Sequence, residues 1–421
     1  MRKTASIRTK ASVRKKLAWI GTFLGPGVLA ALADNDAGGV ISYTVTGAKF
    51  GIGLFLPLTL CLVFLTYTVQ EMSMRLGVVA SEGYLPLVRK NYGRFWMAIQ
   101  LLALAVQNLI TLATEFIGMS AGLVLLGLPL WCAVVLSAFL AIMLSLYGNY
   151  ASKEKIALCI GALNIAFVLT DIWTKPDLGA VAQSFWTWSV PENERGSLFW
   201  YIAALVGNAI APWMIFYQNG AYLDKGVQSE DIHKGRIDTL VGCIWHVMIA
   251  AALILCGAAM FGKIQNVEEA DPAILISCLE SEFGRIPAVL FGLGLFNAGL
   301  LASITVSLSS SWTLAESFGW SKSLDDKIRD APGFYAIYAG SVLLAAGIVL
   351  IPGIPMNHLA VVAQVVGGAL MIPILVFLTL LTSQRRILGN FASTAFQKTR
   401  NWIVVILLAS VSVVTILQAL F

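Results

Sequence analysis

The stretch Ala33-Asp34-Asn35-Asp36-Ala37-Gly38-Gly39 interrupts an otherwise apolar run from Leu17 to about Val45. An apolar run of that length is typical of a helix that crosses a membrane. Charged side chains and glycines at its centre are costly in lipid and break the helical hydrogen-bond ladder. Such a break is kept where the freed carbonyl groups and carboxylates line a cavity and bind something positive. The stretch therefore predicts a broken membrane helix with a cation site at the break.

The composition of the whole chain agrees with a membrane protein. Its 421 residues are 58% hydrophobic and 12% charged, and the mean hydropathy is +0.80. Soluble domains carry about 25% charged residues. The apolar runs are long rather than alternating, which excludes an outer-membrane β-barrel. The composition predicts an all-α polytopic membrane protein embedded in a lipid bilayer.

The composition also limits the kinds of molecule that the protein is expected to bind. The formal net charge of +5 does not indicate nucleic-acid binding, because the basic residues lie in loops and at the N-terminus. The six cysteines are scattered without a CxxC spacing, so neither a zinc site nor a disulfide framework is predicted. We therefore expect no nucleic acid and no cofactor, and we expect a monomer.

Eleven apolar segments can be marked along the chain, each long enough for a membrane helix. They cover residues 17–46, 51–74, 96–124, 129–149, 156–173, 198–222, 239–262, 286–317, 333–352, 356–382 and 402–421. The first of them is the broken one. The sequence thus predicts about eleven transmembrane helices.

The basic residues orient these segments. With the N-terminus inside, the tail of residues 1–16 and the loops after the even-numbered segments hold 23 of the 28 Lys and Arg residues. Loops rich in Lys and Arg remain on the cytoplasmic side. The apolar run after the tail is too long for a signal peptide and offers no clean cleavage site. We expect a multi-pass protein of the inner (plasma) membrane, with a basic cytoplasmic tail at 1–16.

A second interrupted segment lies at residues 198–222. Pro212 removes a backbone donor and clashes with the preceding turn, and Gly207 weakens the same region. Asn208 supplies a side-chain carbonyl four residues before the proline. For this segment alone, a kink tolerated by neighbouring helices is an equal alternative.

Breaks in the first and sixth segments suggest two inverted repeats of five helices. The repeats would cover residues 17–173 and 198–382, with residues 402–421 as an extra helix. In such folds the substrate binds at the membrane midplane, where the two breaks face each other. The pattern therefore predicts one central site shared by both broken helices.

Other polar residues lie within the apolar segments. Glu115 is a proton carrier, a neighbour of the site, an ion-pathway ligand or a structural residue. Gln364 points at the site or bonds a neighbouring helix. We expect His246 to be a hydrogen-bonded helix residue rather than a ligand, and Glu71 to form an interfacial i,i+4 salt bridge with Arg75.

Several motifs resemble helices of the Nramp family of divalent-metal transporters. The family's first helix carries Gly-Pro-Gly followed by Asp-Pro-Gly-Asn, and Gly25-Pro26-Gly27 with Asp36-Ala37-Gly38-Gly39 is similar. The other matching stretches are Gln70-Glu71-Met72 with Arg75-Leu76-Gly77, Glu115-Phe116-Ile117-Gly118, Gly207 to Pro212, and Gln364-Val365-Val366 with Leu381-Thr382-Ser383. The resemblance covers nearly the whole chain. It implies metal-ion transport and a leucine-transporter-type fold with helices 1 and 6 broken.

The departures from the family pattern concern the metal ligands. The family's metal-binding Asp matches Asp36, whereas its Asn falls on Gly39. The family's Ala-x-x-Met in helix 6 falls on Asn208 to Ala211, so a methyl group replaces the methionine sulfur and an amide replaces the alanine. The histidine after the proline becomes Trp213.

Two further departures concern proton passage. The aspartate that the family uses in helix 3 falls on Leu112, and the segment 335–351 lacks the family's basic residue in helix 9. Both changes remove parts of the expected proton path. The pattern resembles the Nramp-related magnesium transporters, a branch thought to move Mg²⁺ and Mn²⁺ without proton coupling.

This resemblance implies a site made of oxygen donors. A thioether is a soft ligand that works against Mg²⁺, and its loss leaves carboxylate, amide, carbonyl and water oxygens. Small residues at Gly38, Gly39 and Ala211 would leave room for a partly hydrated ion. The predicted metal-site residues are Asp36, Asn208, Ala211, Asp34 and Gly39, with Glu115, Gln364 and Trp213 in the ion pathway or around the site.

The leading hypothesis is a secondary carrier that facilitates uptake of Mg²⁺, with Mn²⁺ as a second substrate. One alternative is a proton-coupled Mn²⁺/Fe²⁺ symporter with an atypical site. Another is a sodium-coupled carrier for organic solutes, since one fold serves many substrates. The carboxylates of the first helix disfavour it, because an anionic substrate group prefers half-helix N-termini without acidic neighbours.

An enzyme is the alternative from a different class. The sequence contains no His-Glu-x-x-His, Gly-x-Ser-x-Gly or nucleotide-binding loop. Asp34 and Asp36 are two residues apart and would not share one face of an intact helix. We therefore predict a transporter and no catalytic residues.

Overall fold

The computed structural model describes residues 25–146, 150–269 and 271–420, and within these ranges its regular elements are helices. The predicted tail at 1–16 and the start of the first segment lie outside them. The α-helices are α2 (Pro26–Ala33), α3 (Ala37–Phe50), α4 (Phe55–Ala80), α5 (Tyr84–Tyr92), α6 (Arg94–Leu125), α7 (Leu130–Leu146), α8 (Tyr150–Ala162), α9 (Ile165–Thr174), α10 (Leu178–Thr187), α11 (Leu198–Ala209), α12 (Pro212–Asp224), α13 (Ile232–Ala258), α14 (Pro272–Phe283), α15 (Arg285–Phe318), α16 (Pro332–Val349), α17 (Met356–Thr382), α18 (Arg385–Leu388) and α19 (Ala395–Leu420). Three 3₁₀ turns lie at Glu192–Ser197, Ser229–Asp231 and Gly389–Phe391.

The helices confirm an all-α membrane protein. Nine helical stretches of the described chain are long and apolar enough to cross a bilayer. The two remaining predicted segments correspond to the shorter apolar helix α7 and to the broken pair α2 and α3. The short helices α5, α10 and α14 lie in connections for which no helix was predicted.

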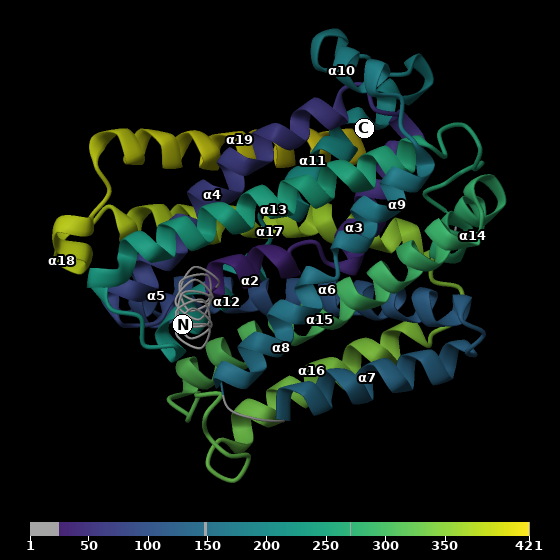
Figure 1. Cartoon of the computed structure of the whole chain (residues 1–421). Helices are drawn as coiled ribbons and strands as arrows, with labels where there is room; N and C mark the ends of the chain where they lie inside the picture. Colours follow the sequence, from purple (N-terminus) through teal and green to yellow (C-terminus); the bar gives the residue numbers. More distant parts are fainter. Residues whose placement is uncertain (1–24, 147–149, 270, 421) are drawn as a thin grey trace, which may run out of the picture.

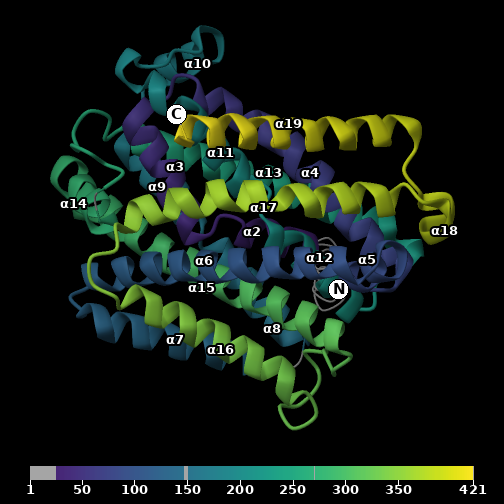
Figure 2. The same cartoon turned by 180° about the vertical axis from the view of Figure 1, so that it is seen from behind.

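The long helices run roughly along one direction, and the short connecting helices lie at the ends of the bundle (Figure 1). Figures 1 and 2 place α5 and α18 at one end and α10 and α14 at the other, while α2 lies near the middle. The pairs Arg89 with Lys90 in α5 and Arg385 with Arg386 in α18 therefore lie at the same end. This agrees with the predicted sorting of basic loops to one side of the membrane.

Both predicted helix breaks are present. The first helix consists of α2, which ends before Asp34, and α3, which begins after Asp36. The sixth consists of α11, which ends at Ala209, and α12, which starts with Pro212 at its first position. Proline is favoured there because the first residue of a helix needs no donor.

A third break divides the fifth segment between α8 and α9. Asn164, fully buried, donates its side-chain amide to the Leu32 carbonyl at 3.1 Å and accepts from the Asn297 amide at 2.6 Å. Asn164 thus connects the end of α2 to α15. The apolar pattern of residues 156–173 predicted one continuous helix and gave no sign of this break.

Glycines bring the broken helices close to their neighbours. A Cβ at Gly207 in α11 would collide with the backbone carbonyl of Gln364 in α17. Likewise, a Cβ at Gly47 in α3 would collide with the backbone of α13, and a Cβ at Gly257 in α13 would collide with the backbone of α3. Small residues permit such close helix packing inside a membrane. The breaks are therefore held against α13 and α17.

Candidate metal site

Asp36 begins α3 and lies at the first break. Its backbone is extended, with φ −70° and ψ 165°, and its Oδ1 accepts a hydrogen bond from the Gly39 N–H at 2.5 Å. A side-chain acceptor at this position satisfies an otherwise unpaired donor of the first helical turn. The residue is only 2% exposed. The carboxylate is thus fixed at a helix N-terminus in the interior of the bundle.

Asn208 contacts the same break from the sixth helix. A Cβ added at Gly39 would collide with the Asn208 side-chain amide, so this amide lies directly against the Gly39 backbone. Asn208 is buried, and neither its oxygen nor its nitrogen has a hydrogen-bond partner in the described chain. Buried amides are usually paired. The structure therefore brings Asn208 to the Asp36 turn and leaves its oxygen available.

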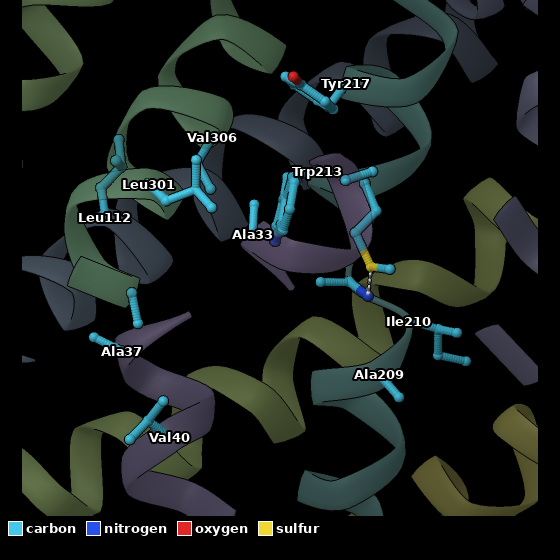
Figure 3. Packing of buried hydrophobic residues seen from close by; sticks show 14 of the residues in the cluster. Ala33, Ala37, Val40, Leu112, Ala209, Ile210, Trp213, Tyr217, Leu301 and Val306 are labelled. Atoms are coloured by element: carbon cyan, nitrogen blue, oxygen red, sulfur yellow. Dashed lines mark hydrogen bonds between the residues drawn. The ribbon is translucent and has the colours of Figure 1, made fainter. Parts of the chain in front are cut away.

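A sulfur atom also lies at the second break. The Ala211 N–H donates to the Met214 Sδ at 3.2 Å, as the dashed line in Figure 3 shows. The expectation that only oxygens surround this break is therefore wrong. Met214 stands three residues after Ala211, but Ala and Met are not the residue types of a capping box, so no sequence pattern indicated this contact.

Glu115 of α6 caps the N-terminus of α3. Its Oε2 accepts from the Ala37 N–H at 2.8 Å, and its Oε1 lies 3.5 Å from the Thr114 hydroxyl. A carboxylate is favourable at a helix N-terminus because of the unpaired N–H groups and the helix dipole. Glu115 is fully buried, and its charge lies close enough to interact with that of Asp36. It therefore belongs to the site's immediate surroundings.

Gln364 reaches the site from α17. An added Cβ at Gly38 would lie 2.6 Å from the Thr114 hydroxyl and 2.9 Å from the Gln364 Nε2. The spaces beside Gly38 and Gly39 are thus filled by side chains from α6, α11 and α17. The expected room for a hydrated ion at these two glycines is absent from this occluded conformation.

Asp34 faces α13 and pairs with a histidine. Its Oδ2 lies 3.2 Å from the His246 Nδ1, without the geometry of a hydrogen bond, and both side chains are buried. The His246 Nε2 lies 3.4 Å from the Tyr43 hydroxyl. His246 is therefore a hydrogen-bonded helix residue, as expected, and it also lies beside Asp34 of the break.

Asn35 is a polar residue of the break that was not among the predicted ligands. It lies between the two aspartates, is fully buried, and neither of its amide atoms has a hydrogen-bond partner in the described chain. The burial of an unpaired amide is costly. Its place between two charged residues could have marked it as a further oxygen donor.

Trp213 packs against the first helix rather than among the polar groups. Figure 3 draws its ring beside Ala33 of α2, and α2 and α12 pack together. The ring is fully buried and lies 6.2 Å from the Tyr217 ring, measured between centroids. Trp213 therefore closes the apolar side of the break.

The groups at the breaks combine carboxylates with neutral donors. No group of three His, Cys, Asp or Glu side chains suited to a metal is present in residues 25–146, 150–269 and 271–420. Asp34 and Asp36 lie at the first break, Glu115 lies beside it, and Asn208 contacts it from the second break. These side chains are the candidates for holding a small cation.

Comparisons with known proteins agree with this geometry. The chain is 24% identical to the divalent metal cation transporter MntH of Deinococcus radiodurans, covering 93% of this chain and 88% of that protein. It is 25% identical to the protein of the same name from Bacillus subtilis, covering 94% and 92%.

Solved structures show the same fold. A manganese transporter of Eremococcus coleocola superposes with a TM-score of 0.76 at 20% identity, covering 94% of this chain and 87% of that one. The protein MhsT in complex with L-phenylalanine superposes with a TM-score of 0.54 at 14% identity, covering 94% and 98%. The model of the natural resistance-associated macrophage protein-like family matches residues 27–418. The chain therefore belongs to the Nramp family and is not an enzyme.

Proposed function

We propose that this protein is a secondary carrier that facilitates the uptake of divalent cations, chiefly Mg²⁺ and also Mn²⁺, without moving protons. The relatives are named as divalent metal cation or manganese transporters, which supports a divalent metal as substrate. The preference for Mg²⁺ and the lack of coupling rest on the residues of this chain. We further propose that the end with α5 and α18 faces the cytoplasm of a bacterial inner membrane.

The observation that carries the proposal is the contact between the two breaks. Asn208 lies against the turn that Asp36 caps, and its amide has no other hydrogen-bond partner in the described chain. Carboxylate and amide oxygens suit hard cations such as Mg²⁺. Mg²⁺ dehydrates reluctantly and is usually bound through one or two carboxylates while it keeps several waters, which fits the carboxylates of Asp34 and Asp36.

The loss of the titratable residue at two family positions supports uncoupled transport. Leu112 of α6, labelled in Figure 3, is a fully buried apolar residue where the family pattern has an aspartate. Helix α16 carries no Lys, Arg or His between Pro332 and Val349. A proton would have no titratable group at either position.

The main experiment measures ion flux into proteoliposomes together with an internal pH dye. Mg²⁺ and Mn²⁺ should enter the vesicles while the internal pH stays constant. Asp36→Asn keeps the helix cap but removes the charge, so uptake of both ions should fall at least tenfold. Asp177, which caps α10 at the surface, provides the matched control, and Asp177→Asn should transport at the normal rate.

Two results would contradict this proposal. Normal flux in the Asp36→Asn variant would remove Asp36 from the site. Flux of Mn²⁺ alone, accompanied by acidification, would replace the proposal with proton-coupled transport of a transition metal.

Met214 favours that second candidate function. A thioether at the break would prefer Mn²⁺ and other transition metals over Mg²⁺. In our proposal the sulfur only accepts the Ala211 N–H, so Met214→Leu should change the ratio of Mn²⁺ to Mg²⁺ flux less than twofold. A selective tenfold loss of Mn²⁺ flux would instead show that the sulfur binds the ion.

A further inference from the structure

At the end of the bundle near α18, three arginines from three helices lie within ion-pair distance of one buried carboxylate. Glu71 of α4 lies 3.3 Å from Arg75 one turn later, 3.0 Å from Arg236 of α13 and 3.8 Å from Arg400 of α19. The predicted i,i+4 pair of Glu71 and Arg75 is therefore present, and both side chains are buried. We call these four residues the arginine cluster.

The arginine cluster carries an excess of positive charge. Glu71 is the only carboxylate within ion-pair distance of the three arginines in the described part of the chain. Arg75 is held inside by the Phe391 carbonyl at 2.8 Å and the Ser393 hydroxyl at 3.2 Å. Two positive charges are left without a counterion, and a charge near a membrane is costly unless it is paired.

The two outer arginines are partly exposed, and Arg400 also donates to the Asn401 side-chain oxygen from its Nε at 3.4 Å and its Nη2 at 3.3 Å. The side chains of Arg236 and Arg400 are 33% and 13% exposed, whereas that of Arg75 is fully buried. Arg236 uses its Nε for Glu71, so its two terminal nitrogens remain directed elsewhere. A planar guanidinium binds phosphate oxygens with two parallel hydrogen bonds.

Three apolar stripes end at the arginine cluster. On each of three helices, exposed apolar residues lie three or four positions apart and therefore share one face. Each stripe ends at a polar residue, which is either an arginine of the cluster or its neighbour Tyr67. The stripes are Leu60, Phe64 and Tyr67 on α4, Ile244, Leu240 and Arg236 on α13, and Leu407, Ile403 and Arg400 on α19.

These stripes fix the depth of the cluster in the membrane. Helices α13 and α19 both pack against α4, and Figure 1 shows the three running together toward the end with α18. Exposed Leu, Ile and Phe side chains face the hydrocarbon of the bilayer, so the polar ends of the stripes lie at the level of the lipid headgroups. Arginine stems can extend along such a surface to keep their charge at this level.

We propose that the arginine cluster binds the phosphate headgroup of an anionic phospholipid of the cytoplasmic leaflet, with the acyl chains lying along the stripes of α4, α13 and α19. The choice of leaflet rests on the proposed orientation of the chain. Basic pockets between membrane helices on the cytoplasmic side bind anionic headgroups. The lipid supplies the missing negative charge and links α19 to α4 and α13.

The test compares the thermal unfolding of the full chain in detergent with and without added lipid. Phosphatidylglycerol should raise the Tm of the wild type by several degrees, whereas phosphatidylcholine and inorganic phosphate should raise it by less than one degree. The double variant Arg236→Gln/Arg400→Gln should lose at least half of the phosphatidylglycerol shift. The single variants keep the test possible if the double variant does not fold.

The matched control is a double variant that removes two positive charges from the same end of the bundle. Arg89→Gln/Arg329→Gln changes two exposed arginines outside the cluster and should keep the full shift. Native mass spectrometry should count fewer retained phosphatidylglycerol molecules on Arg236→Gln/Arg400→Gln than on this control. Equal shifts in the two double variants, or an equal shift with phosphate alone, would overturn the proposal. Either result would leave the proposed ion transport unaffected.

Discussion

The two helix breaks contact each other at Gly39. Gly39 has no side chain, and the space that a Cβ would need holds the Asn208 amide. The Gly39 N–H also binds the Asp36 carboxylate at 2.5 Å. One glycine therefore sets both the position of the Asp36 carboxylate and the approach of the Asn208 amide, the two ligands that we propose. Its replacement tests whether this contact matters.

Gly39→Ala should destabilise the protein and slow transport, because the new methyl group must displace the Asn208 amide from the break. The cost of such overpacking is about 1–3 kcal/mol. Thermal unfolding should show a lower Tm, and the flux assay should show at least a tenfold slower uptake of Mg²⁺. Gly340→Ala, on a helix surface with nothing within 4 Å, provides the control and should behave like the wild type.

The double variant Gly39→Ala/Asn208→Ala separates the two effects. Removing the amide frees the space for the methyl group, so the Tm should recover much of its loss while transport stays low. Recovery of transport in the double variant would show that the Asn208 oxygen is dispensable.

At the scale of the elements, the half-helix α2 is held at its N-terminus by a residue of α13. The Asp238 carboxylate accepts hydrogen bonds from the N–H groups of Gly25, Gly27 and Val28 at 2.8, 2.7 and 3.2 Å. The Tyr222 hydroxyl of α12 donates to the same carboxylate at 2.9 Å. Hydrogen bonds to a charged acceptor are the strong ones. Asp238 thus fastens both half-helices to α13 on the proposed cytoplasmic side.

Asp238→Ala should release α2 from α13, since three backbone donors would lose their buried acceptor and gain from contact with water. Hydrogen exchange of the peptide covering residues 25–33 should become at least tenfold faster. Asp271→Ala, which removes an exposed cap of α14, serves as the control and should leave that peptide unchanged. Unaltered exchange in Asp238→Ala would mean that other contacts hold α2 in place.

At the scale of the whole molecule, the positions of most helices could be predicted because a bilayer requires long apolar segments with internal hydrogen bonds. The breaks at Asp36 and Pro212 could be predicted because glycine, proline and charge disrupt a helix locally. The break at Asn164 could not, since it depends on Leu32 and Asn297, which are distant in the sequence.

Some features of the candidate site could likewise be predicted from the sequence, and others could not. The residue types at Asp36 and Asn208 are enough to indicate oxygen ligands, because a carboxylate and an amide carry those atoms wherever they lie. The position of the Met214 sulfur depends on how its side chain folds back onto Ala211, and the closed space at Gly38 depends on α6 and α17. The conformation of one side chain decides the first detail and contacts between distant segments decide the second, and no local pattern encodes either of them.

At the opposite end of the bundle, a second set of polar contacts holds a half-helix in place. We call this set, and the contacts of Asp238, the two fastenings. Lys49, at the end of α3, lies 3.0 Å from Glu194 and 2.9 Å from Glu268, and the Tyr201 hydroxyl donates to Glu268 at 3.0 Å. The proposed site between the two ends is buried in this conformation, with Asp34, Asp36 and Asn208 at most 2% exposed. A carrier that alternates between two open states must release one fastening at a time.

Lys49→Ala and Asp238→Ala should therefore bias the carrier in opposite directions. Each single variant should favour one open state and slow Mg²⁺ exchange, because a cycle needs both states and about 1.4 kcal/mol of bias changes their ratio tenfold. Removing both fastenings should restore the balance, so the double variant should exchange Mg²⁺ faster than either single variant. Lys263→Ala, which breaks an exposed pair with Glu282, is the control for lost charge at the same end. If the double variant were slower than both single variants, the two ends would not act against each other, and alternation by these contacts would be refuted.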